Sequence, residues 1–501
     1  MGGRAQRRLG TIEMALLLGL LGDALLRAVP WGINLSVWIL VAIAAGWALL
    51  PARGRQRPAL SGWPLAAAVF FTACVAWRDS GFLRFWNLVA LMAALSLPVL
   101  QSQGIRLHLA RLTDYAAGMV AAGVNVAVGA LLLSPGDTGS RALSRHGKNL
   151  RAVLVGIALS VPLSLVFGGL LMSADPGFDG LVRSVIDVDF QTLLSHVLIT
   201  GFVTWVVAGY LHGLTATSHP VLTSGLTFLR RAAERPALGL VEIGIPLGAL
   251  VVIFVSFVAM QAQYLFGGEQ VILTKAGLTY SQYARRGFFE LIAVSTLLLP
   301  VLLGADWLLR KDKTHHVLAY RGMAGGLLGL IGLIMLSAVQ RMRLYTHMYG
   351  LTEDRFYATA FMGWIGIVFV VFAATVLRGR RNRFAFGALA GGFAVLAALN
   401  LVNPDARIAG SNMARAAAGA EFDVAYVSRL SADAVPALLS GIRQLEAEDG
   451  CRVYWSAIVR WDDRPDGDWR RWNAARAGAR RAVRNSDWMR PATDCRRRSS
   501  A

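Results

Sequence analysis

Charged and tyrosine side chains stand at the ends of several long apolar runs, where their chemistry suits a binding site. They are Asp175, Arg286, Glu290, Arg341 and Tyr345. Arg286 and Glu290 are four residues apart, as are Arg341 and Tyr345, so each pair would share one face of a helix. Ionised groups at membrane depth usually face the bundle interior or a wet cavity, because contact with lipid is costly. Two arginines with acidic and tyrosine partners predict a site for an anionic ligand.

Two alternatives remain open for these residues. They are also typical of interfacial anchors, in which Tyr and Arg lie at the headgroup level and Glu290 pairs with Arg286. An enzyme acting on a lipid-linked or envelope substrate would use Glu290 or Asp175 as acid or base, with the arginines holding phosphate. The sequence has no CxxC, HExxH, Walker loop or GxGxxG after a strand, so it identifies no catalytic residue, metal or cofactor.

The elements that must position these side chains are membrane helices. Hydrophobic residues make up 55% of the 501 residues and charged residues only 16%, against about 25% charged in soluble domains. A helix needs roughly 20 apolar residues to cross a bilayer, and twelve candidate runs are present up to residue 402. They cover 12–29, 32–50, 62–77, 82–100, 113–133, 151–173, 190–213, 240–264, 287–309, 322–344, 356–377 and 384–402.

The fold class is therefore predicted as an all-α, multi-pass transmembrane bundle over residues 1–402, with about 11 to 12 spans. Basic loops place the N-terminus in the cytoplasm and residues 403–501 outside it. Because twelve crossings would put both ends on one side, we expect about 11, either with the run at 113–133 re-entrant or interfacial or with the short run at 62–77 not crossing. Asp23 and Arg27, four apart, are expected to neutralise each other, whereas His196 has no partner at ligand spacing.

Residues 403–501 form a second, extracytoplasmic segment about one small domain in length. Apolar spacings of three and four predict amphipathic helices over 411–448 and again over 468–484, while 453–459 (VYWSAIV) is strand-like. Its five tryptophans are more typical of a core than of a contact surface. Cys451 and Cys495 are the only cysteines of this segment, and we expect them to form a disulfide in an oxidising compartment. The last residues are Arg-dense and predict a frayed tail.

The formal net charge of +20 does not indicate nucleic-acid binding, because most of the excess lies in loops between the apolar runs. The expected partners are the lipid bilayer and an anionic ligand, and no protein partner is identified. Transport or binding of a small anionic ligand at an outward-facing polar site is the preferred function. The membrane enzyme is one alternative, and a structural or sensory envelope component acting through residues 403–501 is another.

Several segments resemble a known family. They are SADPGF at 173–178, YSQYARRGFFEL at 280–291, SAVQRMRLYTHMYGLTEDRFYA at 337–358, NPDARIAGSNMARA at 403–416, FDVAYVSRLSADAVPAL at 422–438 and DWRRWNAARAGARRAV at 468–483. In this order they are similar to the bacterial membrane proteins of domain of unknown function 4173. The resemblance implies a polytopic protein of the bacterial inner membrane with a short extracytoplasmic end. It implies no activity and no site residue.

Overall fold

The computed structural model describes residues 2–49, 62–102, 104–132, 190–215, 238–266, 288–461 and 468–486, together with 171, 175 and 177. Its long helices are α1 (Gly2–Leu26), α2 (Ile33–Leu49), α3 (Trp63–Trp77), α4 (Gly81–Ser102), α5 (Leu112–Leu132), α8 (Phe190–Thr215), α10 (Leu240–Phe266), α13 (Phe288–Leu308), α14 (Thr314–Tyr349), α15 (Glu353–Thr375) and α16 (Phe384–Val402). The later helices are α17 (Pro404–Ala417), α18 (Val424–Val427), α19 (Val435–Gly441), α20 (Ala447–Trp461) and α21 (Ala474–Arg484). Short 3-10 helices are η1 (Leu107–Leu109), η2 (Arg381–Arg383), η3 (Ile442–Gln444) and η4 (Trp469–Arg471).

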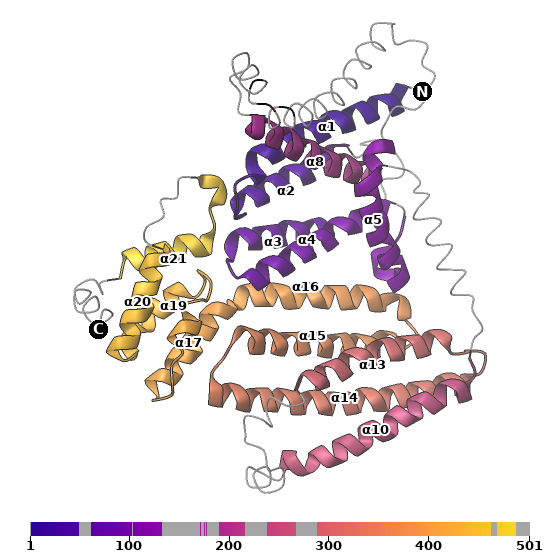
Figure 1. Ribbon diagram of the computed structural model, residues 1–501. Helices are drawn as coiled ribbons and strands as arrows, with labels where there is room; N and C mark the ends of the chain where they lie inside the picture. Colours follow the sequence, from indigo (N-terminus) through magenta and orange to yellow (C-terminus); the bar gives the residue numbers. More distant parts are fainter. Residues whose placement is uncertain are drawn as a thin grey trace.

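Most of the long helices lie side by side along roughly the same axis, and the later helices lie together at one end of them (Figure 1). We call α17 to α21 with η3 and η4 the cap, the end of the bundle that carries them the cap end, and the opposite end the far end. The start of α1 lies at the far end (Figure 1). The two ends of the described chain are therefore on opposite sides of the bundle.

Seven of the described helices are long and apolar enough to cross a membrane: α4, α8, α10, α13, α14, α15 and the stretch that ends in α16. The shorter α2 and α3 are also apolar. No strand occurs among the described residues, apart from one isolated bridge between Leu238 and Leu309. The all-helical prediction is confirmed, and the chain is an integral membrane protein with several apolar helices. Apart from Leu171, the run at 151–173 lies outside the described residues.

Hydrophobic clusters lie on both sides of α16. One joins α10, α13, α14 and α15, where Leu327, Ile331 and Ile334 of α14 recur at the helical spacing and are buried. The other side contains α1 to α5 and α8, with buried residues such as Phe71 and Leu211. Because α16 contacts α15 on one side and α3, α4 and α5 on the other, it joins the two halves of the bundle.

Helix α5 does not follow the direction of its neighbours and lies at the far end (Figure 1). Gly118 near its start faces Leu100 at the end of α4, and Gly129 near its last turn meets Gly209 of α8. A Cβ on Gly209 would lie 2.3 Å from the backbone oxygen of Asn125, so the close crossing of the two helices depends on glycine. Helix α5 thus links the far end of α4 to the far half of α8.

The cap is helical in its described part. The helices expected within 411–448 and 468–484 are present as parts of α17, α18, α19 and α21, but the expected strand at 453–459 is wrong, because these residues lie within α20. Val453, Tyr454 and Ala457 are buried at spacings of one and three, which suits one helix face rather than an alternating strand. Acidic residues in the first turn of α20 and Arg460 in its last turn also favour the helix. The Arg-dense tail lies beyond the described residues.

Candidate functional site

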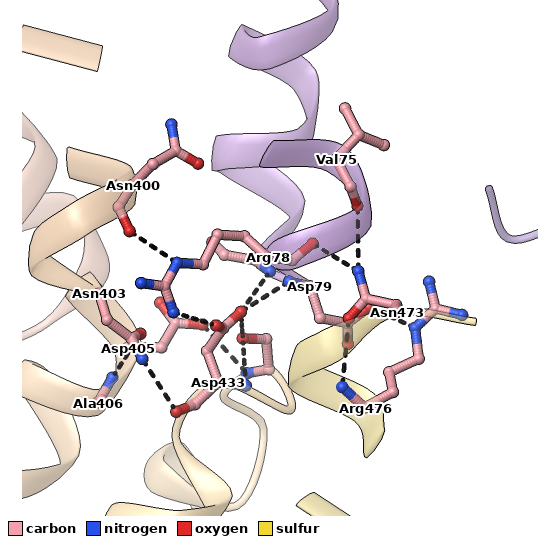
Figure 2. Close-up of polar contacts among 12 residues, drawn as sticks. Val75, Arg78, Asp79, Asn400, Asn403, Asp405, Ala406, Asp433, Asn473 and Arg476 are labelled. Atoms are coloured by element: carbon pink, nitrogen blue, oxygen red, sulfur yellow. Dashed lines mark hydrogen bonds and ion pairs between the residues drawn. The ribbon is translucent and has the colours of Figure 1, made fainter. Parts of the chain in front are cut away.

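The cap binds to the bundle at the turn between α3 and α4. Arg78 directly follows α3, and its side chain is only 8% exposed. Its Nε donates to the backbone oxygen of Asn400 at 2.7 Å, and its Nη1 donates to Oδ1 of Asp433 at 3.0 Å (Figure 2). The guanidinium of Arg78 therefore connects α3 to both the end of α16 and the cap.

Asp433 is the cap residue that accepts hydrogen bonds from the α3–α4 turn, and its side chain is 2% exposed. Besides Arg78, its carboxylate accepts the backbone N–H of Asp79 at 2.7 Å and that of Ser80 at 3.2 Å. The hydroxyl of Ser431 also donates to it. A buried carboxylate is stable when a cation and several donors surround it, and Asp433 has both.

A second set of polar contacts to the α3–α4 turn comes from the start of α21. The side chain of Asn473 caps this helix by accepting from the backbone N–H of Arg476 at 3.2 Å, while its amide donates to the backbone oxygens of Val75 and Arg78, each at 3.0 Å. Arg476 donates from Nε to Oδ1 of Asp79 at 2.8 Å (Figure 2). The α3–α4 turn is thus held from two separate cap segments.

Asp405 contrasts with Asp433, although both are buried. Asp405 is 1% exposed, its Oδ2 accepts from the backbone N–H of Ser431 at 3.2 Å, and its Oδ1 has no hydrogen-bond partner among the described residues. Burial raises the pKa of the Asp405 carboxyl above its usual range, the hydrogen bonds from Ser431 oppose this, and the carboxylates of Asp433 and Asp79 raise it further. Its burial beside two other carboxylates therefore favours the protonated form of Asp405.

A polar cluster at the cap ends of α1 and α8 includes Asp23, Arg27 and His196. Oδ1 of Asp23 accepts from Nε and Nη2 of Arg27 at 3.1 and 3.0 Å, as the spacing of four predicts. Nδ1 of His196 forms a short contact with Oδ2 of Asp23, and Nη1 of Arg27 donates to Oγ of Ser195 at 2.9 Å. The sequence prediction for His196 missed this partner, which lies 173 residues away.

A groove of about 730 Å³ lies between α2, α4, α5 and α8. Apolar side chains make up almost all of its lining, which on α4 extends from Phe85 to Pro98. The polar groups of Trp38 and Tyr210 are already engaged, since they donate to the backbone oxygens of Leu18 and Leu95 at 3.0 and 2.9 Å. The groove therefore offers hydrocarbon contact and almost no hydrogen bonding.

The predicted anion-binding residues are only partly described. Glu290 in the first turn of α13 is exposed, while Arg341 and Tyr345 of α14 are half-buried. All three lie at the cap ends of adjacent helices. Asp175 is exposed and accepts from the backbone N–H of Gly177 at 2.9 Å, and Arg286 lies outside the described residues. The common site of these residues stays a prediction.

Other predicted features of the site have different outcomes. Among the described residues, no group of three or more His, Cys, Asp or Glu side chains is placed to hold a metal ion. Cys74 is buried and free. Cys495 is not within the described part of the chain, so the Cys451–Cys495 disulfide stays a prediction. Trp455, Trp469 and Trp472 are exposed, so the expectation of a core position is wrong for these three.

Comparison with known proteins gives a family but no activity. No curated protein and no solved structure matches the chain. Residues 65–441, more than half of the chain, match the family described as domain of unknown function (DUF4153). The resemblance to domain of unknown function 4173 is therefore corrected. The chain belongs to the DUF4153 family.

Proposed function

We propose that the protein binds the hydrocarbon chain of a bilayer lipid in the groove between α2, α4, α5 and α8. The observation that carries this proposal is the almost wholly apolar lining of a 730 Å³ groove inside the membrane bundle. Ligand pockets commonly measure about 300–1,000 Å³. A polar ligand would lose its hydrogen bonds to water and gain few in return, so the lining favours hydrocarbon.

The length and direction of the groove suit a lipid chain. Its lining on α4 extends from Phe85 to Pro98, which is roughly 20 Å along a helix. One leaflet contributes about half of a hydrocarbon core that is about 30 Å thick, so a full chain can lie parallel to the helices. Trp47, Phe85 and Met92 line the groove and are exposed, so a chain can enter sideways from the bilayer.

Filling the groove tests this proposal. Gly123 of α5 lines the groove, and a Cβ built there meets no atom within 4 Å. Gly123→Phe should therefore occupy the space without a backbone clash. Gly201 of α8 has the same open surroundings but does not line the groove, which makes Gly201→Phe the matched control.

The measurement is native mass spectrometry of protein purified in detergent and extraction of the lipid that it retains. We expect wild type and Gly201→Phe to retain lipid. The amount of lipid that Gly123→Phe retains should be lower by a factor of about ten or more, which corresponds to roughly 1.4 kcal/mol. Equal retention by the two variants, or no retained lipid in wild type, would overturn the proposal.

A second candidate is the anionic ligand expected at the cap ends of α13 and α14. The guanidinium of Arg355 lies 4.1 Å from the ring centre of Tyr345, and Arg341 lies one turn before Tyr345 on α14. Two arginines thus flank one tyrosine, which favours an anion. Reconstituted protein should bind a small anion such as phosphate, and Arg341→Gln should weaken this binding at least tenfold, with Arg443→Gln in the cap as control. Unchanged binding by Arg341→Gln would exclude this site.

We also propose eleven crossings, a cytoplasmic N-terminus and an extracytoplasmic cap in a bacterial inner membrane. The chain leaves α4 at the far end and enters α8 at the cap end, where His196 meets Asp23. An odd number of crossings should therefore separate α4 from α8, which agrees with the sequence prediction that the run at 151–173 crosses and the run at 113–133 does not. Reporter fusions at residues 105 and 145 should then report the same side, and a fusion at 430 the opposite side. Opposite sides for 105 and 145 would contradict the count.

A further inference from the structure

The segment from Trp469 to Trp472, which we call the rim, is held against the α1–α2 loop at the cap end. The backbone N–H of Ile33 donates to the backbone oxygen of Trp472 at 2.9 Å. A Cβ at Gly32 would lie 2.1 Å from that oxygen, so this close approach requires glycine. Arg470 donates to the backbone oxygen of Ala24 at the end of α1. The rim is therefore fixed at the level where α1 ends and α2 begins.

The two tryptophans of the rim are exposed although its backbone is fixed. Trp469 is 62% exposed and Trp472 is 42% exposed. The next residue, Asn473, is fully buried, so the exposure is confined to these side chains rather than shared by the segment. Tryptophan is enriched at membrane–water interfaces, where its apolar ring and its N–H both find partners.

The charge of the same region points to an anionic partner. Residues 468–486 contain six arginines and a single acidic residue, Asp468. Arg476 is engaged by Asp79, and Arg470 by Asp468, whereas Arg471, Arg481 and Arg484 extend from the exposed surface. The partner that fits a positive, tryptophan-bearing surface at the end of membrane helices is an anionic lipid headgroup layer.

We propose that the rim binds the anionic phospholipid headgroups of the leaflet that faces the cap. Trp469 and Trp472 insert at the headgroup level beside α1 and α2, and Arg471 pairs with phosphate. This binding fixes the cap to the membrane surface as well as to the α3–α4 turn. It is independent of the groove, because the rim lies outside the bundle and the groove within it.

The test uses the full chain in nanodiscs of phosphatidylcholine with increasing phosphatidylglycerol, and hydrogen exchange of peptides from 468–486 read by mass spectrometry. In wild type, protection should rise with the phosphatidylglycerol fraction and fall with added salt. Arg471→Gln should weaken the response roughly fivefold, and Trp469→Ala with Trp472→Ala should abolish it. The control is Arg443→Gln, which changes an exposed arginine of η3, a short helix that packs against α17, α19 and α20 of the cap.

Two outcomes would overturn the proposal: protection that is the same in both lipids, and a tryptophan double variant that responds as wild type does. The thermal midpoint of that double variant should be unchanged, because its side chains are exposed, so a folding defect is recognised separately. Gly123→Phe should retain the full response to phosphatidylglycerol. Failure of the groove proposal and failure of the rim proposal are therefore distinguishable.

Discussion

Replacing Asp433 with alanine should release the cap from the α3–α4 turn. The change removes the carboxylate that Arg78 contacts at 3.0 Å, in a pair whose side chains are only 8% and 2% exposed. It also removes the acceptor of the Asp79 and Ser80 backbone N–H groups. Breaking a buried ion pair by removing one partner costs about 3–5 kcal/mol, because the remaining charge stays buried. We expect Asp433→Ala to destabilise cap docking by that amount.

Hydrogen exchange of the full chain in detergent measures this loss. Cap amides that exchange through undocking should exchange roughly 150- to 5,000-fold faster in Asp433→Ala. The control is Glu448→Ala, which removes a cap ion pair with Arg452 whose side chains are 64% and 62% exposed. An exposed pair contributes about 0–1 kcal/mol, so this variant should exchange almost as wild type does.

A double substitution separates the ion pair from general damage to the interface. Arg78→Met with Asp433→Leu replaces both charges by apolar groups, and it should cost less than Asp433→Ala alone, since no buried charge is left unpaired. If Asp433→Ala and Glu448→Ala have equal effects, or if the double variant equals the sum of its single variants, the reasoning is refuted.

Three further predictions concern Asp405, the Asn87–Asn400 pair and the two cysteines of residues 403–501. The folded-state pKa of Asp405 is raised, so its contribution to stability is complete below about pH 4 and is lost as pH rises through that pKa. Between about pH 4 and 8, the thermal midpoint should therefore fall less in Asp405→Asn than in wild type. An equal fall in the two proteins would contradict this. Asn87 of α4 and Asn400 of α16 exchange amide hydrogen bonds of 2.9 and 2.8 Å in a fully buried pair. Asn87→Leu should cost about 1–2 kcal/mol in a denaturant titration, and adding Asn400→Leu should cost less than a second such loss. Peptide mapping without reductant should recover residues 451 and 495 in one linked species that reductant separates, and two free thiols would exclude the disulfide.

The membrane helices were predictable because a hydrocarbon core demands long apolar runs. The runs at 240–264 and 384–402 correspond closely to α10 and α16. The run at 322–344 understates α14, which begins at Thr314 and ends at Tyr349, because its polar ends lie outside the apolar window. The strand expected at 453–459 was wrong because a short apolar run has no periodicity of its own to distinguish strand from helix.

The cap interface was not predictable in the same way. Arg78 and Asp433 are 355 residues apart, and nothing in the spacing of either residue indicates the other. A signal does exist at one side, since the sequence Arg78–Asp79–Ser80 places three polar residues in a very short turn between two apolar runs. Buried polar groups in such a turn need partners from elsewhere in the chain. The need for partners could be inferred from the sequence, but their identity required the fold.

The cap connects the two halves of the bundle, and through α4 it also affects the groove. The cap follows α16, yet Asp433 and Asn473 bind the α3–α4 turn in the other half. Helix α4 begins in that turn, contacts α16 through Asn87, and forms one wall of the groove. Because packed helices move as rigid elements, a shift of the turn also displaces that wall. Asp433→Ala should therefore reduce lipid retention in the groove, although Asp433 does not line it, whereas Glu448→Ala should not.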